Sequence, residues 1–186
     1  MFKIAVLVSG GGTDLQSILD AIETETLTDC EVSYIVADRN CPALDRARKY
    51  KIPFCILKKE DLHSFFQGKE IDLIVLAGYL SILPNNFLQN WEKKIINIHP
   101  SLLPKFGGKG MHGIHVHEAV LAAKEEKSGC TVHYVTEEID GGEIILQREI
   151  PVYSTDTAVL LQERVLEQEH ILLPEAIQKI KEERKR

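Results

Sequence analysis

The chain has 186 residues, of which 44% are hydrophobic and 27% are charged, and its formal net charge at pH 7 is −6. This length indicates one domain with enough residues to bury an apolar core. The acidic balance argues against a nucleic-acid partner, because binding to a duplex needs a basic face.

Short apolar runs alternate with helical patterns over the first hundred residues. The apolar runs predict strands at 3–8, 31–37, 54–57, 72–77 and 94–98. The segments between them predict helices at 14–26, 43–51, 61–67 and 85–90. Runs such as IAVLV and LIVLA are apolar throughout, which is typical of parallel strands covered on both faces. The pattern predicts a Rossmann-like, doubly wound and mostly parallel α/β sheet.

The pattern changes after a glycine-rich segment at 106–113. A helix is predicted at 115–124, and two β-rich runs at 129–136 and 143–151 are separated by a short turn. We expect these runs to pair as antiparallel C-terminal strands of the same sheet. A last amphipathic helix begins near a cap at Asp156, and we expect the charged tail KIKEERKR to fray in solvent.

The compartment is indicated by the first residues and the cysteines. The first apolar run, Ile4 to Val8, is too short for a signal peptide or a membrane span, so no membrane partner is expected. The four cysteines are scattered and form no C-x-x-C pair. These features favour a reducing, cytoplasmic location.

The first candidate site is the run Ser9-Gly-Gly-Gly-Thr-Asp, which joins the first strand directly to a helix. Glycines permit a tight turn, and the amides of Gly12, Thr13 and Asp14 then point outward at a helix N-terminus, where a phosphate is favoured. The run lacks both the lysine of a P-loop and the spacing G-x-G-x-x-G, so a phosphomonoester is favoured over a dinucleotide. A tight turn with Asp14 or Thr13 as the helix cap is an equally good interpretation of the loop alone.

The second candidate site follows the fifth strand. Alternation places Asn97 and His99 on one side of an extended segment, at the carboxyl end of a parallel strand, where open α/β sheets build their sites. An amide and an imidazole are suitable donors to a developing oxyanion. Asp140 lies in the turn between the last two strands, and a carboxylate beside His99 would raise its pKa. A loop histidine and an ordinary turn aspartate are the alternatives.

A metal site is the less favoured interpretation of the other histidines. His112, His115 and His117 together with His99 provide four possible ligands. However, His115 and His117 are two residues apart at a helix start and do not share a face. We therefore expect no metal.

Five stretches of the chain resemble the phosphoribosylglycinamide formyltransferase family. The stretches are IAVLVSGGGTDLQSIL, AGYLSIL, IINIHPSLLPKF, GCTVHYVTEEIDGG and RVLEQEHILLP, in the family's order. The combination of NIHPSLLP with VHYV and IDGG is highly specific and is shared only with related folate-dependent formyltransferases and hydrolases. The resemblance implies transfer of a formyl group from the co-substrate 10-formyltetrahydrofolate to 5'-phosphoribosylglycinamide in purine biosynthesis.

The resemblance also assigns roles to individual residues. It implies a single domain over 1–186, with a Rossmann-like phosphate-binding half at 1–100 and a folate and catalytic half at 101–186. The implied catalytic residues are Asn97, His99 and Asp140. The positions implied for the phosphoribosylglycinamide substrate are Gly12, Thr13, Asp14 and, on the ribose hydroxyls, Glu169. The positions implied for the folate are Leu80, Ser81, Ile82, Leu83 and Asn97.

The sequence departs from the family's pattern at several positions. Asp14 stands where members usually carry Asn, so phosphate binding there must rest on backbone amides. Ser81 replaces a common arginine that the folate's glutamate tail would contact. The region 58–70 is shorter than usual, with Lys59 as the best candidate for a missing basic residue. The segment 107–113 carries extra glycine-rich residues, which form either a mobile cover for the site or an inserted turn.

Three other functions fit parts of the pattern. A formyltetrahydrofolate hydrolase shares the Asn, His and Asp residues, but such members usually carry an N-terminal regulatory domain, whereas this sequence begins at the first strand. Formyltransferases that act on methionyl-tRNA or a nucleotide sugar usually carry a further C-terminal domain. A non-catalytic phosphate- or folate-binding module would not need oxyanion donors. The sequence is compatible with a monomer or a homodimer.

Overall fold

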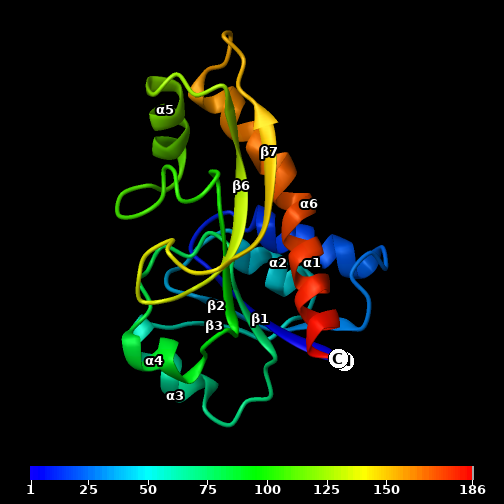
Figure 1. Ribbon diagram of the computed structural model, residues 1–186. Helices are drawn as coiled ribbons and strands as arrows, with labels where there is room; N and C mark the ends of the chain where they lie inside the picture. The colour runs from blue at the N-terminus through cyan, green and yellow to red at the C-terminus, as the bar shows by residue number, and fades with distance from the viewer. Residues whose placement is uncertain (186) are drawn as a thin grey trace.

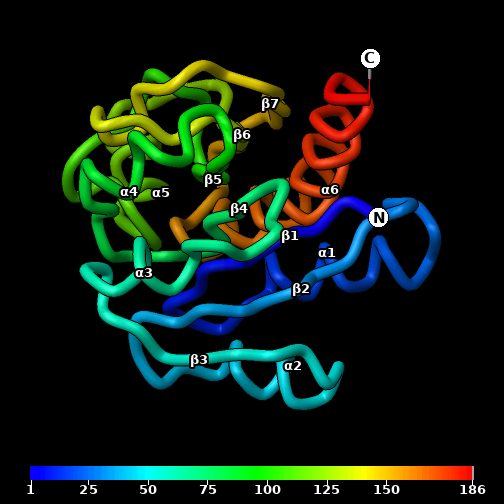
Figure 2. The backbone as a smooth tube through the Cα atoms, turned by 90° about the horizontal axis from the view of Figure 1, so that it is seen from below, coloured from blue at the N-terminus to red at the C-terminus, as the bar shows by residue number. Residues whose placement is uncertain are grey.

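One sheet runs through the whole molecule. The computed structural model describes residues 1–185 and contains seven strands: β1 (Phe2–Val8), β2 (Cys30–Ala37), β3 (Phe54–Ile56), β4 (Leu73–Leu76), β5 (Ile95–His99), β6 (Lys127–Tyr134) and β7 (Ile144–Pro151). Their order across the sheet is β3-β2-β1-β4-β5-β6-β7, which can be followed in Figure 2.

The sheet changes direction after β5. The first five strands are parallel, whereas β6 runs antiparallel to β5 and β7 runs antiparallel to β6. The predicted mostly parallel sheet with antiparallel C-terminal strands is therefore confirmed. In the pairing of β5 with β6, His133 stands opposite Asn97 and Thr131 opposite His99. This register brings side chains from two distant segments of the chain to one place.

Helices cover both faces of the sheet (Figure 1). They are α1 (Thr13–Glu23), α2 (Ala43–Lys49), α3 (Leu62–Phe66), α4 (Asn85–Asn90), α5 (Ile114–Ala122) and α6 (Ala158–Arg184), and a 3₁₀ turn at Lys59–Asp61 precedes α3. One apolar cluster joins α1, α2, α5 and α6 to the sheet, and a second joins α3 and α4 to it. Figure 1 shows α6 alongside β6 and β7, while α3 and α4 lie together at the other side.

The unbroken apolar run of β1 is explained by these two clusters. Ile4, Val6 and Val8 belong to one cluster, Ala5 and Leu7 belong to the other, and all five are fully buried. Because alternate side chains of a strand point to opposite faces, a strand covered on both faces has no polar position. Among residues 1–185, no helix combines the length and apolar character that crossing a bilayer requires.

The start of α6 differs from the predicted one. The N-cap is Thr157, whose Oγ1 accepts a hydrogen bond from the backbone N–H of Leu160 at 3.2 Å. The expected cap, Asp156, instead accepts the N–H of Tyr153 at 2.8 Å and pairs with Arg164. The one-residue difference arises because Asp156 is held by the loop that enters the helix.

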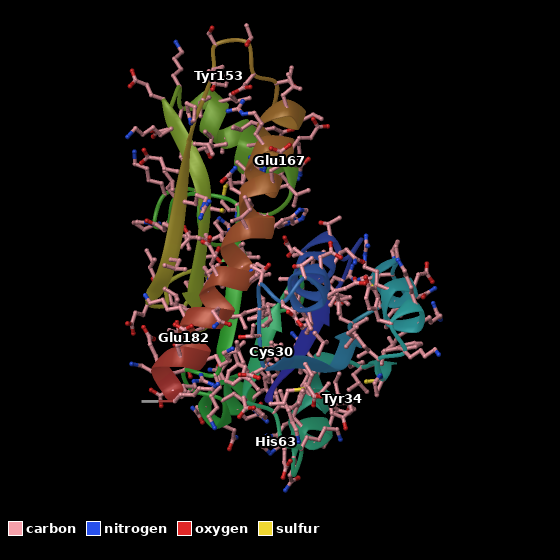
Figure 3. All side chains as sticks on the ribbon, turned by 90° about the vertical axis from the view of Figure 1, so that its right-hand side faces the viewer. Cys30, Tyr34, His63, Tyr153, Glu167 and Glu182 are labelled. Carbon is pink, nitrogen blue, oxygen red and sulfur yellow. The ribbon has the colours of Figure 1, made fainter. Side chains whose placement is uncertain are left out.

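The end of α6 is docked rather than frayed. The helix continues to Arg184, along one side of the molecule in Figure 3, where Glu167 and Glu182 are labelled on it. Arg184 donates to the backbone carbonyls of Asp72 at 2.6 Å and Lys93 at 2.7 Å. Lys181 is buried and donates to the carbonyl of Thr28. The expectation of a fraying tail is therefore wrong through Arg184.

Candidate active site

A cavity of about 490 Å³ lies beside the carboxyl end of β5 and brings together residues from distant parts of the chain. Its lining includes Asn97 and His99 from β5, Asp140 from the turn after β6, Asp14 from α1 and Glu169 from α6. A larger hollow of about 680 Å³ lies between α1 and α6, but Asn97, His99 and Asp140 do not line it. The chemistry of the smaller cavity makes it the candidate site.

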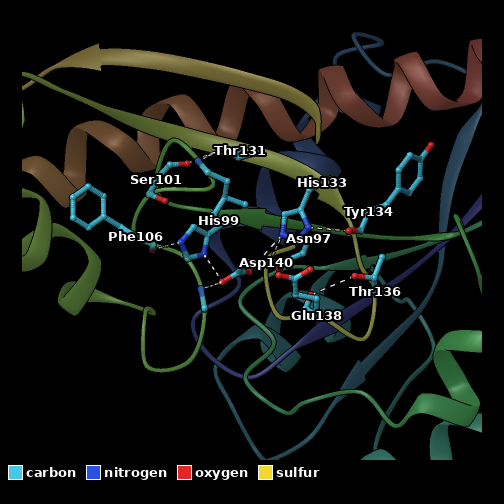
Figure 4. Close-up of polar contacts among 12 residues, drawn as sticks. Asn97, His99, Ser101, Phe106, Thr131, His133, Tyr134, Thr136, Glu138 and Asp140 are labelled. Carbon is cyan, nitrogen blue, oxygen red and sulfur yellow. Dashed lines mark hydrogen bonds and ion pairs between the residues drawn. The ribbon is translucent and has the colours of Figure 1, made fainter. Parts of the chain in front are cut away.

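Asp140 is held at the centre of the polar contacts shown in Figure 4. Its Oδ2 accepts the backbone N–H of Gly108 at 3.0 Å and lies 3.5 Å from Nδ1 of His99. Its Oδ1 lies 3.6 Å from Nε2 of His133. Burial raises the pKa of Asp140, but His133, His99 and the Gly108 amide together lower it below its ordinary value. The carboxylate is therefore ionised at neutral pH.

His99 ends β5 and is almost completely buried, with 4% of its surface exposed. Its Nε2 lies 2.8 Å from the carbonyl oxygen of Phe106, so Nε2 carries a proton and donates it. Burial lowers the pKa of His99, and the opposing effects of Asp140 and the Phe106 carbonyl leave it below the ordinary value. Asp140 therefore lies beside the ring and raises the His99 pKa as expected, but burial outweighs this effect in the free protein.

His133 lies between Asn97 and Asp140 and contacts both side chains. The sequence analysis did not identify it. Nδ2 of Asn97 lies 3.2 Å from Nε2 of His133, and Nδ1 of His133 lies 2.9 Å from the carbonyl oxygen of Tyr134. The carbonyl requires a proton on Nδ1, so in the neutral ring Nε2 accepts a hydrogen bond from the Asn97 amide, whereas in the charged ring Nε2 donates toward Asp140. This bond orients the amide with its oxygen and nitrogen fixed. The VHYV motif, which contains His133, was the sequence signal that could have identified this residue.

The glycine loop makes a close turn between β1 and α1. Gly12 has φ 75°, and a Cβ at this position would lie 2.7 Å from Cβ of Ala43. Gly12 is the N-cap, and no side chain caps the helix, so neither Thr13 nor Asp14 has the capping role considered as an alternative. Because the first N–H groups of a helix have no partner within it, this end of α1 can donate to an anion.

Asp14 and Glu169 meet at the boundary between α1 and α6. Glu169 is 6% exposed, it lines the same cavity as Asp14, and each of the two carboxyl groups affects the pKa of the other. Burial is the largest effect on both groups, raising the pKa of Asp14 to about 6 and the pKa of Glu169 well above its ordinary value. Nε2 of His170 lies 3.6 Å from Oδ1 of Asp14, and neither atom has a hydrogen-bond partner among residues 1–185.

Besides Asn97, the four consecutive positions implied for folate separate into two pairs. Leu80 and Ile82 are exposed by 53% and 61%, and both line the cavity with apolar surface. The hydroxyl of Ser81 donates to Asp38 at 2.6 Å, and Leu83 is buried in the core with α3 and α4. Neither of these two lines the cavity. Lys59 lies in the 3₁₀ turn and does not line it either.

The remaining histidines do not gather around one point. His117 is buried at the edge of the cavity with Nδ1 unpartnered, and burial followed by the proximity of His99 lowers its pKa to about 4. His112 also lines the cavity, whereas His115 is exposed beside Glu118. Within residues 1–185, no three histidine, cysteine, aspartate or glutamate side chains are arranged to hold a metal ion.

The glycine-rich segment forms one wall of the cavity. Residues 108–113 line it, and the Gly108 amide is fixed by Asp140. Gly107 lies close to the same turn, since a Cβ there would be 2.6 Å from Leu103 and 3.2 Å from Asp140. The start of the segment therefore packs against the site, whereas Lys109, Gly110, His112 and Gly113 are exposed.

Comparisons with known proteins give one consistent result. The model of the family described as "Formyl transferase" matches residues 2–177. A chloroplastic phosphoribosylglycinamide formyltransferase of Vigna unguiculata is 40% identical over 193 residues, covering 98% of this chain and 62% of the plant protein. The chain therefore spans about three fifths of that relative's length.

A bacterial relative and a solved structure match over more of their own length. The phosphoribosylglycinamide formyltransferase of Haemophilus influenzae is 36% identical over 185 residues, covering 94% of this chain and 84% of the relative. The crystal structure of phosphoribosylglycinamide formyltransferase from Anaplasma phagocytophilum is 36% identical, covers 98% of this chain and 87% of its own, and gives a TM-score of 0.89.

Proposed function

The chain belongs to the formyl transferase family, and we propose that it transfers the formyl group of 10-formyltetrahydrofolate to the amine of 5'-phosphoribosylglycinamide. The product is N-formylglycinamide ribonucleotide, an intermediate of purine biosynthesis. The observation that carries the proposal is the single cavity that joins Asn97, His99 and Asp140 to the region of the uncapped end of α1. One end offers oxyanion donors, and at the other end Asp14 belongs to the first turn of α1, whose backbone amides can bind a phosphate.

The proposed substrates occupy opposite parts of the cavity. The phosphate binds the backbone amides of Gly12, Thr13 and Asp14, because a helix N-terminus favours an anion. Glu169 contacts the ribose hydroxyls. The pterin and its linker pack on the apolar surface of Leu80 and Ile82, near Asn97. Ser81 and Leu83 act through the shape of this segment, since their side chains are directed to Asp38 and to the core.

The proposed reaction needs no covalent enzyme intermediate. Holding the amine against the formyl carbon supplies several kcal/mol by proximity and orientation. As the amine attacks, negative charge develops on the formyl oxygen, and the Asn97 amide and the Nε2–H of His99 donate to it. His99 supplies this donor even when its ring is neutral, provided that the substrate replaces or shares the Phe106 carbonyl. Each such donor contributes on the order of 3–4 kcal/mol.

Asp140 completes the proposed proton path. Its carboxylate is ionised in the free protein and lies at hydrogen-bonding range of the Gly108 amide, facing two imidazole rings. Through a water molecule it accepts the proton of the attacking amine and returns it to the departing folate nitrogen. If the His99 ring takes up a proton from solvent on Nδ1 as the oxyanion develops, the same carboxylate stabilises the resulting imidazolium.

An acceptor-dependence assay tests the proposal. Deformylation of 10-formyltetrahydrofolate is followed by absorbance with and without phosphoribosylglycinamide. We expect deformylation only with the ribonucleotide. Deformylation at an equal rate without it would instead support a hydrolase, and no deformylation in either case would support a binding module.

The proposal also covers the domain organisation, the oligomeric state and the compartment of the enzyme. We propose a single domain over 1–186 that works as a monomer or homodimer on small molecules, without nucleic acid or membrane. The cysteines Cys30, Cys41, Cys55 and Cys130 are free thiols, which fits a reducing compartment such as the cytoplasm. Sedimentation equilibrium of the purified chain tests the oligomeric state.

A further inference from the structure

Two carboxyl groups face each other at the phosphate end of the cavity. Asp14 is in the first turn of α1, directly after the glycine loop, and Glu169 is in the middle of α6, which packs against α1. The Asp14 side chain is 13% exposed and Glu169 is 6% exposed. Oδ1 of Asp14 is fully buried without a hydrogen-bond partner among residues 1–185, and Glu169 is directed into the cavity.

Within the part of the chain that the structure describes, residues 1–185, no cation neutralises this pair. His170 is the nearest basic side chain, but burial lowers its pKa, so it is neutral at neutral pH. Arg46 on α2 is engaged by Gln16 at 2.8 Å and by the Gly11 carbonyl at 3.1 Å. The other titratable groups around the pair are Cys130 on β6 and the cavity-lining His99, Lys109, His112, His117, Asp140 and Glu163. Two ionised carboxylates in contact at a buried site would repel each other strongly.

We propose that Asp14 and Glu169 retain one proton between them in the free protein and take up a second when a phosphate binds the neighbouring glycine loop. This inference rests on the proposed function for the identity of the ligand, but the retained proton is a property of the free protein. The negative phosphate opposes the remaining carboxylate charge, and protonation of Asp14 removes that charge and supplies an O–H donor. Substrate affinity is therefore coupled to pH through this pair.

The direction of the coupling follows from the free-state charges. Asp14 raises the pKa of Glu169, whereas Glu169 lowers the pKa of Asp14, so the retained proton stays on Glu169 and Asp14, whose pKa is about 6, is the group that loses its proton first as the pH rises. Binding at this pH requires proton uptake, so the KM for phosphoribosylglycinamide rises above pH 6, by up to about tenfold per pH unit. The phosphate's own ionisation acts equally on the wild type and on a variant, so the ratio of the two KM values isolates the pair.

The retained proton is tested without any ligand. Between pH 4 and the raised pKa values, the folded state binds more protons than the unfolded state, so wild-type stability falls as pH rises. Asp14→Asn and Glu169→Gln each remove one titrating carboxyl group, so this penalty is smaller in the variants than in wild type. For each variant, the melting temperature minus that of wild type should increase by about 2–4 °C or more between pH 5 and pH 8. Glu23→Gln, an exposed position at the end of α1, is the control and should show no such trend.

The second proton is tested by titration calorimetry of the full chain with phosphoribosylglycinamide at pH 7.5 in two buffers of different ionisation enthalpy. We expect uptake of close to one proton by wild type and none by Asp14→Asn. Binding without proton uptake in the wild type, or a melting difference between wild type and Asp14→Asn that is constant with pH, would overturn the inference. Failure of the wild type to bind the ribonucleotide would contradict the proposed function instead, while the melting experiment would still decide the retained proton.

Discussion

Oδ2 of Asp140 lies 3.5 Å from Nδ1 of His99, and this contact joins the turn after β6 to the end of β5. On its other side, the His99 ring is fixed by the Phe106 carbonyl. Both ring nitrogens therefore face acceptors inside a buried site, where burial favours the neutral ring and the acceptors favour the charged one. The ring is thus prepared to accept charge when the substrate brings a developing oxyanion.

Asp140→Asn removes the carboxylate that opposes the effect of burial on His99. We expect the pKa of His99, already below its ordinary value, to fall further, because Asp140 is the largest contribution that raises it. Turnover should decrease at least about a hundredfold. NMR titration of the His99 ring and measurement of kcat check the two effects. An unchanged His99 pKa would contradict the electrostatic role of Asp140.

His99→Ala removes one oxyanion donor from the proposed transition state. We expect kcat to decrease by about 10²–10³, with a small change in KM. His115→Ala is the matched control, because His115 is exposed and pairs with Glu118 outside the cavity. Near-normal turnover in His99→Ala, with the fold verified by circular dichroism, would remove His99 from the mechanism.

His133→Ala tests a positioning role, since His133 accepts from the Asn97 amide and reaches Asp140 only at 3.6 Å. Loss of one hydrogen bond of about 1 kcal/mol should reduce kcat about fivefold to tenfold with KM little changed. His133→Gln keeps an acceptor and should recover part of kcat. Equal loss in both variants would indicate a structural role for the ring instead.

Gly12→Ala tests the turn of the glycine loop. The new Cβ would lie 2.7 Å from Ala43 at a φ of 75°, so we expect a destabilisation of about 1–3 kcal/mol and a higher KM for the ribonucleotide. Gly10→Ala is the control, because nothing lies within 4 Å of a Cβ at that position. Chemical denaturation and steady-state kinetics compare the two. Equal effects at both positions would argue against a specific constraint at Gly12.

His117→Gln tests whether a buried, neutral His117 lowers the stability of the folded protein at acid pH. Because the folded pKa of about 4 lies below the ordinary value, the folded state binds fewer protons between pH 6.5 and 4, and stability falls as pH falls through this range. The variant cannot titrate, so its melting temperature should decrease less than that of wild type between pH 7 and pH 4.5. A parallel decrease would show that His117 is not buried in the neutral form.

The sheet was predictable because its signals are local. β1 has no polar position between Ile4 and Val8, which indicates cover on both faces, and the apolar pattern of the later runs indicated the antiparallel pair β6 and β7. The ends of α6 were not predictable by the same means. Whether Asp156 or Thr157 caps the helix depends on how the entering loop folds around Asp156, and whether Arg184 docks depends on the Asp72 carbonyl, which is far away in the sequence.

The candidate site was predictable in its residues and less so in its electrostatics. Motifs identified His99 and Asp140, but the net pKa of His99 depends on how deeply the ring is buried, which no local pattern encodes. The role of His133 depends on the register that places it opposite Asn97. The pair formed by Asp14 and Glu169 arises from the packing of α1 on α6, more than 150 residues apart in sequence order.

The most direct test of the account is the stoichiometry of formyl transfer. The purified chain is incubated with limiting 10-formyltetrahydrofolate and excess phosphoribosylglycinamide, and both tetrahydrofolate and formylated ribonucleotide are quantified by mass spectrometry. The account predicts one formylated ribonucleotide for each folate deformylated, and initial rates of both products about 10²–10³ lower with His99→Ala at the same protein concentration. Release of free formate in place of formylated ribonucleotide would contradict it.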